Sequence, residues 1–314
     1  MSFLTLLRDD VRSGLDRTPQ EYRDKHAAWI KAQQQPDGGF GNRRSKSDLY
    51  YTAFALRSLS ALNALTPEIA RSAVCFLKAL MTQPEALRTR QPSGCFSDAV
   101  MAASWWDCLG LCEEVAGPQL EQNESQSARN TTRARLSALR RSDGGYGKTD
   151  VDGCGSLYHT FLAACAYLRM GEELPEPSRA LDFVRSITLP EGGFLENKYS
   201  KRPGTNGCAA GVVLSSVLGD ADNLERHARF VAGMHSAEGG FYATPAAPIA
   251  DLLSTYTALF TLKILERSQQ RLTSRALAYA RTLEADSGGY TGFALETIVD
   301  CEYTFYGLGV ESLA

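Results

Sequence analysis

The chain has 314 residues, 44% of them hydrophobic and 22% charged, and its formal net charge is −3. These fractions are typical of a globular protein with a sizeable core. A charge so close to zero provides no global field to attract nucleic acid or an anionic membrane, so neither is an expected partner.

The start of the chain, residues 1–14, carries acidic side chains where a secretory signal peptide needs a basic start and a long apolar run. The longest apolar stretches, such as 208–218, are far too short to cross a membrane. We therefore expect a cytoplasmic protein without a transmembrane segment, in which the eight cysteines are free thiols.

A diglycine followed by an aromatic residue recurs at intervals of about fifty residues, which is the spacing of a repeat architecture. Full copies begin at Gly38, Gly144, Gly192, Gly239 and Gly288, and a degenerate copy, Gly94-Cys95-Phe96, fills the one gap. Diglycines suit points where a helix has ended and the backbone takes a positive φ. Six units of this kind account for nearly the whole chain.

Each unit carries an apolar helix followed by an amphipathic one. In the first unit an apolar helix begins at Asp48 and extends to Leu62, and the segment 67–81 has the pattern of a helix with one solvent-exposed face. The same pair of patterns recurs in the third unit (156–170 and 177–187) and in the fifth (252–265 and 273–283). The polar run 117–141 lacks a core pattern and predicts an elongated connection inserted into a single domain, 1–314.

One buried and one half-exposed helix per unit predict an all-α fold, an α/α toroid. In such a fold six helix pairs close into a double-layered barrel, and the inner helices line a central cavity. An open solenoid of helix pairs is the alternative, but it needs polar end caps. The apolar last helix, over 303–308, favours closure.

Two segments carry a family resemblance: GGFGNRRSKSDLYYTAFALRSL (38–59) and IVDCEYTFYGLGVESL (298–313). Both resemble the β subunits of protein prenyltransferases and the repeats of class II terpene cyclases such as squalene–hopene cyclase. The resemblance covers all six units. It implies a toroid whose aromatic-lined funnel holds an isoprenoid chain, and a partner protein similar to the transferase α subunit.

The transferase resemblance is incomplete at the metal site. Protein prenyltransferases hold zinc with an Asp, a Cys two residues later and a His in the next repeat. Asp251 matches the Asp, but Leu253 and Tyr303 stand at the other two positions. The family's diphosphate-binding basic residues fall on Thr244 and Ala247, so a zinc-dependent transferase site is not expected in the usual place.

A zinc site elsewhere in the ring is the alternative. His159 stands at the family's His position in the third unit, and the residues around Cys154 are similar to the stretch that carries the family's ligands. A cluster of Asp152, Cys154, His159 and Cys208 has the thiolate and imidazole groups that zinc prefers. The other interpretation is that the cysteines are small buried residues and that His159 is a core histidine.

The cyclase resemblance depends on an Asp-x-Asp-Asp-Thr motif whose middle acid protonates the substrate. The frame that begins at Asp48 lacks this acid, whereas 300–304 keeps Asp300 and places Glu302 at the acid position. Two neighbouring carboxylates raise each other's pKa, as a proton donor requires. The simpler interpretation is that each Asp caps its helix. Known cyclases of this class use a second helical domain, for which the chain is too short.

Basic and aromatic residues complete the candidate site. Arg43, Arg44 and Lys46 precede a predicted helix and are candidate phosphate ligands. The first and sixth units are neighbours in a closed ring, so these residues share a rim with Asp48 and Asp300. The candidate funnel-lining aromatics are Tyr50, Tyr51, Phe54, Trp105, Trp106, Tyr158, Phe161, Tyr256, Tyr303, Phe305 and Tyr306.

Three hypotheses follow. The first is an isoprenoid-handling transferase that binds a prenyl diphosphate on a basic rim. The second is a proton-initiated cyclase that uses Glu302 and Asp300. The third is a non-catalytic toroid that binds a lipid or a protein. Loss of the zinc triad favours the second and third hypotheses.

Overall fold

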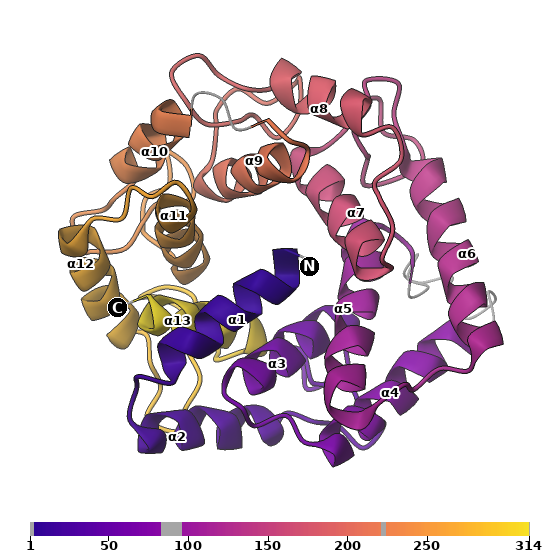
Figure 1. Cartoon of the computed structure of the whole chain (residues 1–314). Coiled ribbons are helices and arrows are strands. Elements are labelled where there is room, and N and C mark those ends of the chain that lie inside the picture. Colours follow the sequence, from indigo (N-terminus) through magenta and orange to yellow (C-terminus); the bar gives the residue numbers. More distant parts are fainter. Residues whose placement is uncertain (1–2, 83–95, 221–223, 314) are drawn as a thin grey trace.

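A computed structural model describes residues 3–82, 96–220 and 224–313. In this part of the chain there are thirteen helices, and twelve of them surround a central axis in two concentric layers (Figure 1). The last helix packs against the first inner helix, so the first and last units are neighbours and the ring is closed. The predicted α/α toroid is confirmed.

The inner layer consists of α3 (Leu49–Ala61), α5 (Ala99–Ala116), α7 (Leu157–Arg169), α9 (Thr205–Val217), α11 (Leu252–Ile264) and α13 (Cys301–Ser312). The outer layer consists of α2 (Gln20–Lys31), α4 (Pro67–Thr82), α6 (Gln122–Leu139), α8 (Pro177–Ser186), α10 (Leu224–Gly233) and α12 (Gln270–Arg281). The remaining helix, α1 (Phe3–Leu15), crosses one end of the ring.

In the described residues, diglycine turns follow α2, α6, α8, α10 and α12 and lead to the next inner helix. Gly38 has φ of 92°, and a Cβ there would lie 1.9 Å from the carbonyl oxygen of Ser72 on the neighbouring outer helix. A side chain at this position would collide with that backbone, so only glycine fits. The aromatic residue after the glycines, such as Phe40, is buried between the layers. Gly94 and Cys95 of the degenerate copy lie outside the described residues.

The connection predicted over 117–141 is wrong, because this segment forms the outer helix α6. Its first turn is held by a capping box between Glu121 and Glu124. Ala128, Thr132 and Leu136 recur every four residues and are buried against the inner layer. One narrow face of small and apolar side chains is therefore enough to dock a helix that is otherwise polar.

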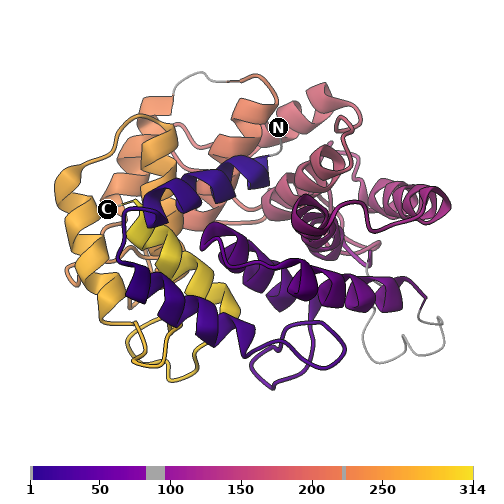
Figure 2. The ribbon, with the colours of Figure 1, turned by 60° about the horizontal axis from the view of Figure 1, so that its bottom comes forward.

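Helix α1 covers the end of the ring at which the inner helices finish. The Arg12 guanidinium donates to the carbonyl oxygen of Ser60, at 2.8 Å, and Arg17 donates to that of Ser312, at 3.2 Å. Both acceptors lie in the last turn of an inner helix, where carbonyl groups lack helical partners. Figure 2 shows α1 at this end and the long interhelical loops at the other. The first turns of the inner helices therefore form the opposite rim.

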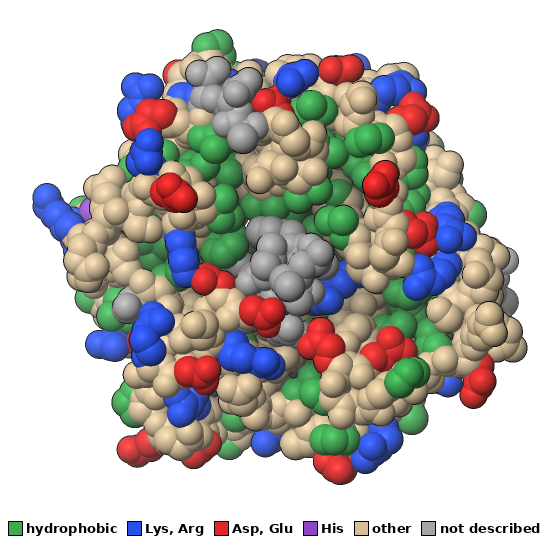
Figure 3. Space-filling model, in the orientation of Figure 1, with side chains coloured by type: hydrophobic (Ala, Val, Ile, Leu, Met, Phe, Trp, Pro, Cys, Tyr) green, Lys and Arg blue, Asp and Glu red, His purple; other side chains and the backbone are tan. Residues whose placement is uncertain are grey.

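The outer surface mixes charges of both signs. On the face that α1 occupies, Lys and Arg side chains are interspersed with Asp and Glu (Figure 3). Cysteines in the described residues are free thiols. Of the helices in the described part of the chain, none has the length and apolar character that a membrane crossing requires.

Candidate functional site

A cavity of about 520 Å³ lies between the inner helices, where the funnel was predicted. Its walls come from α3, α5, α7, α9, α11 and α13. Eight of the residues that line it are aromatic: Tyr50, Phe54, Tyr158, Phe161, Tyr256, Phe260, Phe305 and Tyr306. All of these except Phe260 were predicted from the sequence.

The aromatic wall is continuous on the side of α3 and α13. The ring centroids of Phe54 and Tyr306 lie 5.4 Å apart with an angle of 64° between the planes, and those of Tyr256 and Phe305 lie 5.9 Å apart with an angle of 81°. Such edge-to-face contacts hold the rings in fixed orientations. A cavity of this kind presents π faces and little polar surface, which suits an apolar chain or a cationic intermediate.

Glu302 stands at the edge of this wall, in the first turn of α13. Its Oε1 accepts a hydrogen bond of 2.7 Å from the hydroxyl of Tyr50, which lines the cavity. Burial raises the pKa of Glu302 to about 6, although the bond from Tyr50 and the charge of Arg43 act in the opposite direction. This carboxyl group therefore changes its protonation state near neutral pH, as a proton donor or acceptor must.

Asp300 caps α13 and also forms an ion pair across the closure of the ring. Its carboxylate accepts from the backbone N–H of Tyr303 and, at 2.8 Å, from Nε of Arg43. Burial raises the pKa of Asp300, and these two bonds partly oppose the rise. A second bond, of 2.9 Å, ties Arg43 to Glu296. Residues of the first and last units thus share one rim, as predicted.

The other two capping carboxylates have local roles. Asp48 accepts from the backbone N–H groups of Tyr50 and Tyr51, and Asp251 accepts from that of Ser254. Burial raises the pKa of Asp251. Both side chains fulfil the capping interpretation, which the sequence left open.

The remaining rim candidates differ in position. Arg44 and Lys46 are exposed in the loop before α3. Tyr303 lies under the guanidinium of Arg43, with 5.6 Å between the ring centroid and Cζ. Tyr51 packs beside Tyr50, and burial raises its pKa to about 12.

Glu196 is a carboxylate of the cavity wall that no pattern in the sequence singled out. It lies in the loop before α9 and lines the cavity. Burial raises its pKa, while a hydrogen bond from the hydroxyl of Ser156 opposes this effect. The same hydroxyl lies 2.9 Å from Nδ1 of His159. Glu196 therefore lines the cavity directly, whereas Glu302 contacts it through the hydroxyl of Tyr50.

Buried charges lie about two helical turns deeper. Arg57 is seven residues beyond Tyr50 on α3, roughly 10 Å along the axis. Its Nε donates to Asp107 on α5, at 2.8 Å, and the same carboxylate accepts from Arg169 on α7. Burial opposes ionisation of Asp107, but the two guanidinium charges lower its pKa. The signal in the sequence was a charged residue inside an all-apolar helix pattern.

Trp105 and Trp106 are not part of the cavity wall, so their predicted role is wrong. Trp105 is fully buried, and its Nε1 donates to the carbonyl oxygen of Leu77 on α4. Trp106 donates to Thr132 on α6. Both indoles fit between the inner and outer layers because each points to a different outer helix.

The four-residue zinc cluster is not assembled. Asp152 accepts from the backbone and hydroxyl of Thr149. Cys208 is fully buried on α9, and burial raises the pKa of its thiol to about 12, which disfavours the thiolate that zinc needs. Throughout residues 3–82, 96–220 and 224–313, no three His, Cys, Asp or Glu side chains converge to hold a metal ion. The residues present do not fit zinc.

Comparisons with known proteins agree with this architecture. The sequence model of the prenyltransferase alpha-alpha toroid domain matches residues 4–109 and 105–313, so the chain belongs to this family. The sequence matches no curated protein.

Several solved structures share the fold at low sequence identity. A type II terpene cyclase, MstE from Scytonema with merosterolic acid A bound, is 16% identical with a TM-score of 0.59, covering 99% of this chain and 96% of that one. Protein geranylgeranyltransferase-I from Candida albicans, complexed with GGPP, is 15% identical with a TM-score of 0.55, covering 75% and 73%. A glycosidase is 11% identical with a TM-score of 0.56, covering 99% and 96%.

The match to MstE does not involve a second helical domain, which this chain is too short to contain. The MstE chain is matched over 96% of its length by this chain, with almost no residues of either left over. The glycosidase match shows that one toroid accommodates unrelated chemistry, so function depends on the side chains in the cavity.

Proposed function

We propose that the chain binds an isoprenoid chain in the central cavity and transfers a proton to it from Glu302. The observation that carries this proposal is a carboxyl group, with its pKa raised to about 6, that accepts a hydrogen bond from Tyr50 in the wall of an aromatic cavity of about 520 Å³. The family match supports isoprenoid chemistry at the level of the fold.

The proposed step is an isomerisation and needs no further reactant. Protonated Glu302 gives its proton to a terminal carbon–carbon double bond and leaves a tertiary cation. The π electrons of the next double bond form a new carbon–carbon bond, and loss of a C–H proton to a carboxylate ends the reaction. Glu196 lines the same cavity and is our candidate for that base. Tyr50 donates to the carboxylate left on Glu302, which stabilises the product of proton transfer.

A zinc-dependent transferase is less well supported by the side chains present. Leu253 and Tyr303 cannot replace a thiolate and an imidazole, and Thr244 and Ala247 cannot neutralise a diphosphate. Arg43 already pairs with Asp300 and Glu296. We therefore derive no step through zinc.

A non-catalytic lipid-binding protein is the second candidate. One observation favours it: Tyr50 donates to Glu302 and Arg43 donates to Asp300, and both bonds favour the ionised carboxylates rather than an acid. A protein partner similar to the transferase α subunit stays a prediction.

Lipid binding is tested first, with geranylgeraniol and geranylgeranyl diphosphate as probes and native mass spectrometry as the measurement. Ala209→Phe fills the cavity, because Ala209 lines it, and should abolish binding. Ala79→Phe, on the exposed side of α4, is the matched control and should bind as the unmodified protein does. Failure of both probes to bind the unmodified protein would overturn the proposal.

Proton transfer is tested next, by gas chromatography of the products formed from the same two probes. Glu302→Gln keeps the acceptor for Tyr50 but has no acidic proton, so cyclised product should fall by about 10²–10⁴-fold while binding is kept. Glu68→Gln, on α4, is the control for the loss of one carboxylate. Binding without any isomerised product in the unmodified protein would select the non-catalytic candidate.

A further inference from the structure

Two of the diglycine turns are braced by a histidine from the following outer helix. At the closure of the ring, the backbone N–H of Gly289 donates to Nδ1 of His26, at 3.0 Å. Between α8 and α10, the N–H of Gly193 donates to Nδ1 of His227, at 3.1 Å. Each histidine is buried and stacks on the aromatic residue after its diglycine, with interplanar angles of 12° and 10°.

Other turns satisfy this N–H group differently. The equivalent N–H of Gly39 donates to Asp37, and that of Gly145 donates to Asp143. A histidine therefore accepts from this N–H group at two of the turns, those of Gly193 and Gly289. At both, an accepting Nδ1 fixes the tautomer, so Nε2 carries the proton and is a donor.

The ring-closure junction supplies an acceptor for that donor. Nε2 of His26 lies 3.1 Å from Oε1 of Glu284, and Nζ of Lys25 lies 2.5 Å from the same oxygen. Glu284 comes four residues before the first glycine of its turn and forms a backbone bridge to Tyr290. One carboxylate thus accepts from two adjacent residues of α2.

Among the described residues, the junction between α8 and α10 has the two donors but no carboxylate that accepts from them. Arg226 corresponds to Lys25, because its carbonyl oxygen is the atom nearest to the first glycine of the turn, as the Lys25 carbonyl is at ring closure. Thr188 corresponds to Glu284, since it stands four residues before Gly192 and bridges to Phe194. Its hydroxyl donates to the carbonyl oxygen of Val184. Within the described residues, the Arg226 guanidinium and Nε2 of His227 have no hydrogen-bond or ion-pair partner.

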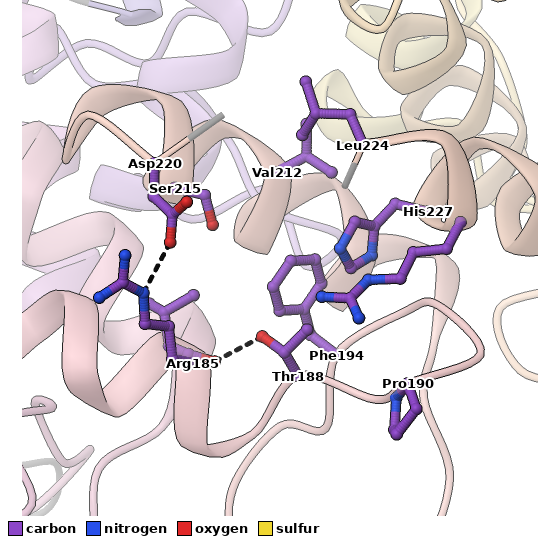
Figure 4. A pocket seen from close by; sticks show the side chains of 11 residues that line it. Arg185, Thr188, Pro190, Phe194, Val212, Ser215, Asp220, Leu224 and His227 are labelled. Atoms are coloured by element: carbon purple, nitrogen blue, oxygen red, sulfur yellow. Dashed lines mark hydrogen bonds and ion pairs between the residues drawn. The ribbon is translucent and has the colours of Figure 1, made fainter. Parts of the chain in front are cut away.

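A cavity lies beside Thr188, which stands at the chain position that Glu284 takes at ring closure. It measures about 290 Å³, and its wall includes Thr188, Ser215, Arg226 and His227. Figure 4 shows the His227 ring over the Phe194 ring, and Arg185 held on Asp220 at the other side of the pocket. We call this space the outer cavity; it is formed by α8, α9 and α10 and is separate from the central cavity.

We propose that the outer cavity binds a small organic carboxylate in the place that the Glu284 side chain takes at ring closure. One carboxylate oxygen accepts from Nε2 of His227 and the guanidinium of Arg226, and Ser215 is a further donor. Bonds from charged groups to a carboxylate are the stronger ones in proteins. The cavity is larger than a carboxylate group, so it has space for the rest of a small acid.

The test uses ¹⁵N-histidine NMR of the full chain, titrated with sodium succinate against sodium chloride at equal ionic strength. Succinate should shift the His227 resonances saturably. His26, whose donor is already bound to Glu284, is the internal control and should not move. Arg226→Gln should weaken binding about ten-fold or more.

Two reciprocal variants locate the site. Thr188→Glu supplies the carboxylate from the chain itself, so it should abolish the succinate effect and raise the melting temperature. Glu284→Thr should make the His26 resonances respond to succinate. Equal binding by Arg226→Gln and the unmodified protein, or an unresponsive His227, would overturn the proposal. Tighter binding of inorganic phosphate than of succinate would overturn the assignment to a carboxylate.

Discussion

The two ends of the central cavity use buried charge in opposite ways. At the deep end, the carboxylate of Asp107 is fully buried between Arg57 and Arg169, and their charges lower its pKa. At the rim, Glu302 has a neutral donor, Tyr50, and its pKa is raised to about 6. A carboxylate held between two cations has a fixed charge. A carboxyl group that is buried with only one neutral donor can exchange its proton, which is what the proposed reaction needs.

Neutralising the deep carboxylate should give the largest effect. Asp107→Asn keeps the shape of the side chain but leaves Arg57 and Arg169 buried without a counter-charge. Breaking a buried ion pair in this way costs roughly 3–5 kcal/mol. Urea denaturation at neutral pH measures the loss of unfolding free energy.

The matched control is the exposed ion pair of Glu68 and Arg71, whose side chains are 75% and 56% exposed. Glu68→Gln should leave the unfolding free energy close to that of the unmodified protein, because solvent screens an exposed pair. If Asp107→Asn and Glu68→Gln lost the same small amount of unfolding free energy, Asp107 would not carry the fixed charge described above.

The carboxyl group of Glu302 should make the stability of the folded chain depend on pH. Glu302 has a pKa of about 6 in the folded chain, against 4.5 for an unperturbed glutamate. The folded state therefore holds the proton more tightly, so this group lowers stability progressively as pH rises from about 4.5 to about 6. Glu302→Gln removes this dependence and should be more stable than the unmodified protein above pH 6, by at most about 2 kcal/mol. Thermal unfolding at a series of pH values would contradict this if the two curves stayed parallel.

The sequence predicted the rim of the cavity better than its deep end. The ring follows from local patterns: the diglycine turns, the capping aspartates and the apolar inner helices. The rim was also accessible, because Asp300 and Glu302 stand at known motif positions and ring closure brings them to Arg43. The choice of Asp300 and Glu302 needed the family resemblance, and their proximity to Arg43 needed only the order of the units around the ring.

The deep network was not predicted, because it joins three different helices. Arg57, Asp107 and Arg169 are far apart in the chain, and nothing local to any of them specifies the other two. Trp105 and Trp106 were misplaced for a similar reason, since each indole points to a different outer helix. Which side of a wholly buried helix faces a cavity depends on its neighbours, and periodicity does not reveal it.

Removing the hydroxyl of Tyr50 should make the carboxyl group of Glu302 harder to ionise. The hydrogen bond from Tyr50 lowers the pKa of Glu302, so Tyr50→Phe should raise that pKa above about 6. A ¹³C NMR titration of the glutamate side chains measures this directly. Tyr51→Phe is the control, because Glu302 accepts from Tyr50 and not from its neighbour. Unchanged titration of Glu302 in Tyr50→Phe would show that the bond has no influence on its proton.

Loss of Arg43 should give the smallest effect on stability. Its side chain is 34% exposed, so solvent screens its pairs with Asp300 and Glu296, and Arg43→Gln should cost less than about 1 kcal/mol. The pKa of Asp300 should rise, because Arg43 lowers it in the unmodified protein. ¹³C NMR of the aspartate side chains measures the pKa, and urea denaturation measures the stability. A loss as large as that in Asp107→Asn would mean that the rim is as rigidly paired as the deep end, and the contrast between the two ends would fail.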